Sequence, residues 1–184
     1  MALKATVFKV ELQLADLDRH YYADHALTLA RHPSETDERL MLRLLAFAAQ
    51  ADTALAFGRG LCEADEPALW RKDLSGNIEL WVELGQPDER RLLRACGLAR
   101  QVVVWAYGGG VELWWKQAAE RLERARNLSV WQLPPAQTQA LAALAERTLQ
   151  LQCTIQEGQF LFSSARGAVT LEPRCLRATD GGVL

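Results

Sequence analysis

Cysteine is scarce in this sequence, and its spacing argues against the most familiar cysteine chemistries. The 184 residues include four cysteines, none in a C-x-x-C pair: Cys62, Cys96, Cys153 and Cys175. That spacing fits neither a zinc ribbon nor a thioredoxin motif. The sequence therefore predicts four free, buried thiols in a reduced compartment, and we expect a cytoplasmic protein.

Long apolar runs and an excess of one charge are also missing. No apolar run approaches the ~20 residues that a membrane-spanning helix needs, and the N-terminal stretch alternates charged and apolar residues, unlike a secretory signal. We therefore expect no membrane association. The formal net charge of -2 removes any overall electrostatic argument for nucleic-acid binding, although a local basic patch is compatible with it.

Three widespread motifs are absent as well. The sequence contains no G-x-S-x-G, no G-x-x-x-x-G-K-[ST] and no G-x-G-x-x-G, so the serine-hydrolase, P-loop and Rossmann classes lose their main support. The glycines at 108–110 lie between a predicted strand and a predicted helix. Without a further motif they are only a weak indication of a phosphate loop.

The residues that are present describe an ordinary globular domain. Hydrophobic residues make up 49% and charged residues 24%, and a chain of this length is expected to form one domain, here 1–184. Residues 4–14 alternate apolar and polar side chains, which predicts a half-buried strand. A second short strand over 26–32 completes an N-terminal hairpin. Next comes the clearest predicted helix, with Ser34 as its N-cap and an apolar stripe that includes Met41 and Leu45.

The middle of the chain predicts a parallel sheet. Residues 67–74 and 77–85 are expected to form two strands around a turn, followed by a helix over 86–100 and an apolar strand over 101–107. A strand, a helix and a strand with short links predict a βαβ unit with a right-handed crossover. Further expected elements are a helix over 111–126, a strand over 128–133, a helix over 134–148 and a C-terminal hairpin around Glu157–Gly158. The predicted fold class is α/β, with a mixed sheet flanked by helices and with N-terminal and C-terminal β-hairpins.

Acidic residues beside buried strands need an explanation, because burying a lone carboxylate is costly. Glu79 and Glu83 share one strand face, and Glu83 lies at the carboxyl end, where ligands of α/β sheets collect. Residues four apart on a strand are about 13 Å apart, too far to bind one Mg²⁺ at ~2.1 Å. A second carboxylate is expected from Asp73, if it lies opposite Glu79, or from Glu38, which falls on the apolar stripe of its helix. We predict that Glu38 and Glu83 share a pocket, and that Trp81 is buried under a helix.

Structural explanations for the same acids remain open. Glu79 pairs with Lys72 in this alternative, Glu38 caps its helix, and Glu83 bonds to a helix N-terminus. Three cations lie on the helix that follows Glu83: Arg90, Arg91 and Arg94. They either contact phosphate oxygens or neutralise the neighbouring acids.

Several long segments together resemble the bacterial YaeQ family. The matching segments are LTLARHPSETDERLMLRLLAFA (27–48), GLCEADEPALW (60–70), IELWVELGQPDERR (78–91), NLSVWQL (127–133) and the opening MALKAT (1–6). This resemblance implies a single domain with the restriction-endonuclease-like fold of the PD-(D/E)XK superfamily, which agrees with the α/β order expected above.

The resemblance also implies roles for the acids. In that superfamily a helix and two strands contribute acids that hold Mg²⁺, and the last strand carries (D/E)-x-K. The segment V-E-L-G at 82–85 matches that element, so Glu83 becomes the matched acid and Glu38 the helix acid, while the middle acid is Glu79 or Asp73. Gly85 stands where the motif has lysine. Arg90 or Lys72 would have to replace that lysine if catalysis is retained.

Two functions follow from these observations. The first is a Mg²⁺-dependent phosphodiesterase acting on nucleic acid, with Glu38, Glu79, Glu83 and Arg90 as catalytic residues and Asp73 as a further candidate metal ligand. The second is a non-catalytic module that binds nucleic acid or a protein linked to transcription. The missing lysine and the nearly neutral charge favour the second function, and the acids at the strand end favour the first.

Overall fold

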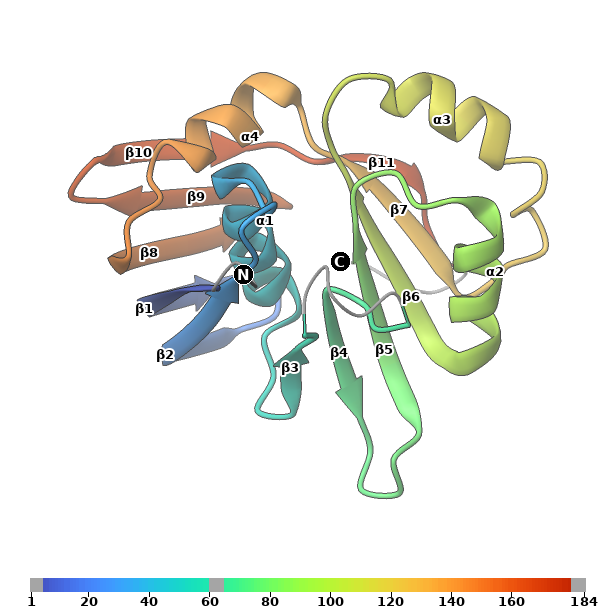
Figure 1. Cartoon of the computed structure of the whole chain (residues 1–184), viewed down its shortest axis with the longest axis horizontal. Coiled ribbons are helices and arrows are strands. Elements are labelled where there is room, and N and C mark those ends of the chain that lie inside the picture. Colours follow the sequence, from blue (N-terminus) through green and yellow to red (C-terminus); the bar gives the residue numbers. More distant parts are fainter. Residues whose placement is uncertain (1–4, 60–64, 180–184) are drawn as a thin grey trace.

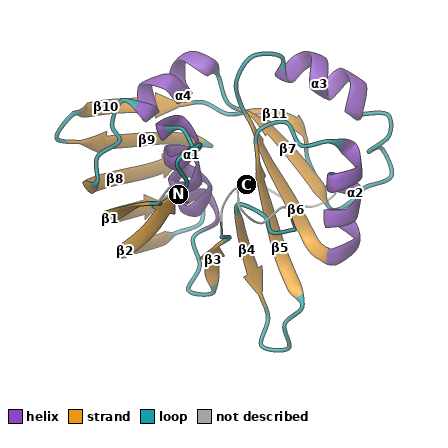
Figure 2. Ribbon diagram, viewed as in Figure 1, coloured by secondary structure: helices purple, strands orange, loops and turns teal. Residues whose placement is uncertain are grey.

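In the part of the chain that the structure describes, two mixed β-sheets and four helices form a single-domain α/β fold (Figures 1 and 2). The computed structural model describes residues 5–59 and 65–179. The helices are α1 (Asp37–Gln50), α2 (Glu89–Leu98), α3 (Val111–Ala118) and α4 (Pro135–Ala142). The strands are β1 (Thr6–Asp16), β2 (Tyr21–Arg31), β3 (Leu55–Phe57), β4 (Leu69–Lys72), β5 (Ile78–Leu84), β6 (Ala99–Ala106), β7 (Leu128–Gln132), β8 (Thr148–Gln156), β9 (Gln159–Ser164), β10 (Gly167–Leu171) and β11 (Arg174–Arg177).

The first sheet joins the two ends of the chain. Its strand order is β10-β9-β8-β1-β2, with β1 parallel to β8 and the other pairs antiparallel. The predicted alternation in β1 is confirmed, because its even-numbered residues from Phe8 to Leu14 are buried. The second strand is longer than expected and begins at Tyr21, because β2 pairs with β1 along its whole length.

The second sheet contains the predicted βαβ unit. Its order is β11-β7-β6-β5-β4-β3, and the central strands β5, β6 and β7 are parallel. The predicted mixed sheet is confirmed, and the predicted N-terminal and C-terminal hairpins build a second mixed sheet instead of extending the central one. The short strands β3 and β11 at its edges were not expected from the sequence.

Helix α1 lies between the two sheets (Figure 1). Every residue from Leu40 to Ala49 is buried, including the charged Arg43. The N-cap is Thr36 instead of the expected Ser34, because the Thr36 hydroxyl accepts from the Arg39 N–H at 3.1 Å. One apolar core therefore runs from the first sheet through α1 to the inner face of the second sheet.

The remaining helices are shorter than the sequence predicts. Helix α3 ends at Ala118, and the chain continues in tight turns, where Arg177 donates to the carbonyls of Glu123 and Ala125 at 3.0 and 2.8 Å. Helices α2 and α3 cover the outer face of the second sheet and form a second apolar cluster with it. None of the helices in the described part of the chain is long and apolar enough to cross a membrane.

The thiols are only partly as predicted. The described cysteines are free, but only Cys153 is buried; Cys96 is half-buried and Cys175 is exposed. Burial raises the pKa of Cys153 far above its usual range and that of Cys96 to about 11. Cys62 lies outside the described residues.

Candidate functional site

Glu83, one of the predicted site acids, is buried and accepts hydrogen bonds from two side chains. It is 4% exposed, on the face of β5 that α2 covers, because alternation along the strand turns Leu80, Val82 and Leu84 toward α1. Its Oε1 accepts from the indole N–H of Trp81 at 2.7 Å and from Nε of Arg91 at 2.8 Å. The carboxylate is thus buried together with two donors, as a charged group in an apolar setting requires.

Arg91 ties this acid to its surroundings. Its Nη2 donates to the carbonyl of Glu66 at 2.8 Å, and its backbone N–H donates to Asp88, the N-cap of α2. The guanidinium therefore joins α2, β5 and the segment before β4. The sequence predicts a bond between Glu83 and a helix N-terminus, but the donors are the side chains of Trp81 and of Arg91, which lies in the first turn of α2. Trp81 is buried against Leu92 and Ala95, which confirms its predicted position.

The other predicted acids lie elsewhere. Glu38 accepts from the Thr138 hydroxyl at 2.6 Å and so contacts α4, on the side of the second sheet opposite Glu83. The predicted pocket shared by Glu38 and Glu83 is therefore wrong. Glu79 pairs with Arg71 at 3.1 Å, and Arg71 reaches Asp52 at 3.4 Å. Arg71 takes the role expected of Lys72.

Lys72 and Asp73 also differ from expectation. The ammonium of Lys72 lies 3.6 Å from the centroid of the Trp70 ring. Asp73 closes the β4–β5 turn by accepting from Asn77 Nδ2 at 2.9 Å and from the N–H groups of Ser75 and Asn77. These bonds, led by the one from the Asn77 side chain, lower the pKa of Asp73. Because Arg71 pairs with Leu80 and Lys72 with Ile78, Asp73 lies beyond the ladder and not opposite Glu79.

These positions do not fit the Mg²⁺ that the resemblance implies. Across residues 5–59 and 65–179, no three His, Cys, Asp or Glu side chains come together in a way that could hold a metal ion. Gly85, in place of the motif lysine, has φ +94. A lysine in this left-handed conformation costs about 1–2 kcal/mol. The acids are held by separate partners instead.

A cavity opens beside the Glu83 pair. It measures about 350 Å³ and is lined by Asp65, Trp81, Asp88, Arg90, Arg91, Arg94 and Ala95. Arg90 is exposed at this cavity and makes no hydrogen bond or ion pair with the described residues. Arg94 makes an ion pair with Asp65 at 2.6 Å, with both side chains more than half exposed. Exposed pairs of this kind are weak, so the guanidinium groups are available to an anionic ligand.

Charge is unevenly distributed along the chain. Residues 86–126, which carry α2 and α3, contain eight Lys or Arg and five Asp or Glu, a net charge of +3 within a chain of net charge -2. The exposed cations of this segment are Arg90, Arg94, Arg100, Lys116, Arg121, Arg124 and Arg126. The net charge of the whole chain does not reveal this basic segment. A count by segment would have found it in the sequence.

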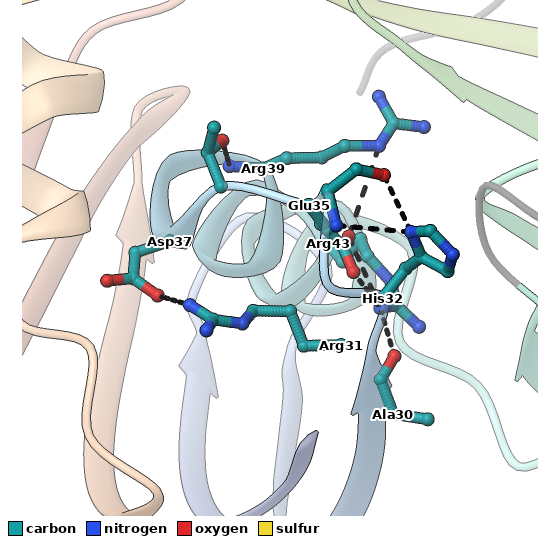
Figure 3. Close-up of polar contacts among 9 residues, drawn as sticks. Ala30, Arg31, His32, Glu35, Asp37, Arg39 and Arg43 are labelled. Atoms are coloured by element: carbon teal, nitrogen blue, oxygen red, sulfur yellow. Dashed lines mark hydrogen bonds and ion pairs between the residues drawn. The ribbon is translucent and has the colours of Figure 1, made fainter. Parts of the chain in front are cut away.

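A second polar cluster joins the two sheets at the start of α1 (Figure 3). Glu35 is buried and accepts from Nη1 of the buried Arg43 at 3.2 and 3.4 Å. Arg43 also donates to the Ala30 carbonyl of β2 at 3.1 Å, and Arg39 donates to the Leu84 carbonyl of β5 at 3.3 Å. Burial lowers the pKa of Arg43, partly offset by Glu35. This cluster was not expected from the sequence.

Comparison with known proteins identifies close relatives. The YaeQ protein family model matches residues 1–173. An uncharacterized protein YaeQ of Salmonella typhi is 48% identical over 173 residues, covering 94% of this chain and 96% of that protein. Its counterpart in Escherichia coli K12 is 50% identical over 159 residues, covering 86% and 88%.

Two crystal structures show the same fold. The YaeQ protein of Xanthomonas axonopodis pv. citri has a TM-score of 0.92 at 52% identity, covering 95% of this chain and 99% of that one. The YaeQ protein of Pseudomonas syringae has a TM-score of 0.92 at 36% identity, covering 96% and 98%.

Proposed function

Because the chain belongs to the YaeQ family, whose relatives above are described as uncharacterized, we propose a function from its own residues. The protein is a non-catalytic module that binds nucleic acid through the exposed face formed by residues 86–126. Phosphate groups are the ligand, the guanidinium groups around the cavity are the main contacts, and recognition is largely electrostatic.

The segregation of charge is the observation that carries this proposal. Seven exposed cations gather on one segment of net charge +3, whereas the remaining residues sum to -5. Arginine offers several N–H donors in a rigid plane and suits phosphate oxygens. Arg90 and Arg94 stand beside a cavity of about 350 Å³, which falls in the size range of small-ligand sites. Nucleic acid explains this face better than a protein linked to transcription does.

The hydrogen bonds of the predicted site acids support a non-catalytic role. Glu38 is bonded to Thr138, Glu79 to Arg71, and Glu83 to both Trp81 and Arg91. A metal ion would have to share the carboxylates with these donors and also bring together side chains from the two faces of the sheet. Of the two candidates for the missing lysine, Arg90 stays charged and is a poor proton acceptor, and Lys72 lies over the ring of Trp70.

The resemblance to the PD-(D/E)XK fold is part of the same proposal. We propose that α1, β3, β4, β5, α2 and β6 are a degenerate PD-(D/E)XK core. The order of the elements supports this, since a helix precedes an antiparallel pair, and a second helix leads to a strand parallel to β5. Gly85 and the dispersed acids are the features that mark it as degenerate.

Fluorescence anisotropy with labelled single- and double-stranded DNA and RNA tests the proposal. Binding is expected in EDTA as well as in Mg²⁺, and the double variant Arg90→Glu/Arg94→Glu should weaken it at least ~10-fold, because each lost charge-assisted contact is worth about 1.5–3 kcal/mol. The matched control is Lys9→Glu/Arg147→Glu, which changes the charge equally at exposed positions of the first sheet.

Three results would contradict the proposal. One is the absence of binding to all four nucleic acids at low salt. Another is equal weakening by the control variant. The third is robust Mg²⁺-dependent cleavage that Glu83→Gln abolishes, which would restore the phosphodiesterase as the function.

A further inference from the structure

The free edge of β2 is the longest unpaired strand edge among the described residues. The two sheets end in β10 and β2, and in β11 and β3. Three of these edge strands are short, with three residues in β3, four in β11 and five in β10, whereas β2 has eleven. Figure 1 shows β2 at the outer side of its sheet, and β1 is the described element that runs along it.

The backbone groups that face outward can be assigned from the neighbouring strands. Lys9 N–H donates to the Arg147 carbonyl at 2.7 Å, and Leu17 N–H donates to the Ile155 carbonyl at 2.8 Å. Odd-numbered residues of β1 therefore bond to β8, and even-numbered residues bond to β2, because successive residues of a strand point to opposite sides. The bonds of β1 reach the odd-numbered residues of β2, since Leu12 pairs with His25.

Even-numbered residues of β2 consequently present their N–H and C=O groups to the free edge. The Ala30 carbonyl agrees with this assignment, because it accepts from Arg43 of α1 at 3.1 Å. Four residues remain with both backbone groups directed outward: Tyr22, Asp24, Ala26 and Thr28. Their side chains are all exposed. This is a regular row of four donors and four acceptors.

The edge lacks the features that normally protect one. Proteins blunt edge strands with proline, lysine, bulges or a short length. Strand β2 has no proline and no lysine, and its register with β1 runs from Tyr21 to Arg31 without a shift. By contrast, the register of β11 shifts after Cys175, and Pro173 soon follows β10.

We propose that this edge pairs antiparallel with the same edge of a second copy, so that the two first sheets become one continuous sheet. The register that uses all four outward residues places Tyr22 opposite Thr28 and Asp24 opposite Ala26 of the second copy, with His25 on the two-fold axis. Each donor then meets an acceptor, and the Ala30 carbonyl stays with Arg43. No carboxylate lies opposite another, since Asp24 faces an alanine.

We choose a second copy of the chain as the partner because the free edge of β2 is complementary to itself. In a two-fold contact both chains present the same patch, and one interface covers both unprotected edges. The small side chains of Ala23 and Ala26, which lie on opposite faces of β2, leave room for the strand of the second copy. The proposal is independent of the nucleic-acid face, which is formed by residues 86–126 and includes no strand of the first sheet.

Light scattering coupled to size exclusion tests the oligomeric state. The wild-type chain should elute at twice its own mass, and Ala26→Pro should elute at the mass of one chain while keeping its circular dichroism. Proline removes only an N–H that does not bond to β1, a position that edge strands tolerate. The matched control is Ala168→Pro, because Val169 pairs with Phe162 of β9 and Ala168 therefore faces the free edge of β10. This control should remain dimeric.

Cross-linking tests the register without relying on proline. His25→Cys should form a disulfide between copies under mild oxidation with copper phenanthroline, since non-hydrogen-bonded pairs bring Cα atoms to ~4.5 Å. Leu27→Cys should not, because its two copies would be about 13 Å apart. Wild type treated in parallel gives the background from native thiols. A monomeric wild type, a dimer unaffected by a folded Ala26→Pro, or equal cross-linking of both cysteine variants would overturn the proposal.

Discussion

Removing the negative charge of Glu83 by mutation distinguishes a structural role of this side chain from a role in metal binding. Glu83→Gln keeps an acceptor for Trp81 but removes the negative charge beside Arg91. A hydrogen bond to a charged group is worth about 1.5–3 kcal/mol, and Arg91 is 30% exposed, so we expect a loss of about 2 kcal/mol in the free energy of unfolding. Urea unfolding followed by tryptophan fluorescence measures it.

Glu79→Gln is the matched control for this experiment. Glu79 and Arg71 are both about one-third exposed, and such pairs are worth roughly 0–1 kcal/mol. A Glu83→Gln variant as stable as wild type would contradict the structural role. A gain in stability on removal of the charge would point instead to an acid kept for ligand binding.

The thiols give a prediction about reactivity. Only the thiolate reacts, and burial raises the pKa of Cys153 far above its usual range and that of Cys96 to about 11. We expect N-ethylmaleimide at pH 7 to modify the exposed Cys175 first, Cys96 more slowly, and Cys153 only after addition of urea. Peptide mapping by mass spectrometry locates each adduct. Early labelling of Cys153 in the native protein would contradict its burial.

Residue types alone could predict part of the candidate site. The position of Glu83 at the end of a buried strand and the burial of Trp81 follow from alternation, and both are found. The partners do not follow from it, because Arg91 and Arg90 look alike in the sequence and only the turn of α2 directs Arg91 to Glu83. The buried Glu35 was not expected from the sequence. Its burial depends on Arg43, eight residues later, and on a carbonyl of β2.

At the scale of elements, the start of α1 gives a direct test of capping. Thr36 accepts from the Arg39 N–H, whereas the Ser34 hydroxyl lies 2.6 Å from Nδ1 of His32. Loss of an N-cap typically costs about 1 kcal/mol, so Thr36→Ala should lower the free energy of unfolding by that amount. Ser34→Ala should change it by less than ~0.5 kcal/mol, as exposed substitutions usually do. The reverse order in urea unfolding would contradict the assigned cap.

Periodicity predicts the elements better than their ends. Strand β1 and helix α1 have strong patterns and are found near the expected places. The expected helix over 111–126 stops at Ala118, and the chain continues in tight turns in which the carbonyls of Glu123 and Ala125 accept from Arg177 of β11. That donor is about fifty residues away in the sequence. Strand β2 begins earlier than expected since its pairing with β1, and not its own polarity, sets its length.

At the scale of the whole molecule, the division into two sheets could not be predicted from local sequence patterns. It depends on β1 pairing in parallel with β8, which brings residues about 140 positions apart into one ladder. A hydrophobic strand can extend either sheet equally well. Helix α1 favours this outcome, because its residues from Leu40 to Ala49 are buried and join the core that both sheets share.

This shared core predicts that the two sheets unfold together. The six tryptophans all lie between β4 and β7 and report on the second sheet, while Cys153 in β8 reports on the first. Because α1 and the contact between Trp105 and Phe160 join both halves, the urea midpoints from fluorescence and from pulsed thiol labelling of Cys153 should coincide at one protein concentration.

A variant in the connecting helix sharpens the test. Leu45→Ala removes a fully buried side chain of α1 and should cost roughly 2–5 kcal/mol. Both midpoints should fall by the same amount, since neither sheet keeps a complete core without the helix. If the Cys153 thiol became reactive at a urea concentration that left the fluorescence unchanged, the first sheet would be a separate cooperative unit. The contacts of α1 with the second sheet would then contribute less than its burial indicates.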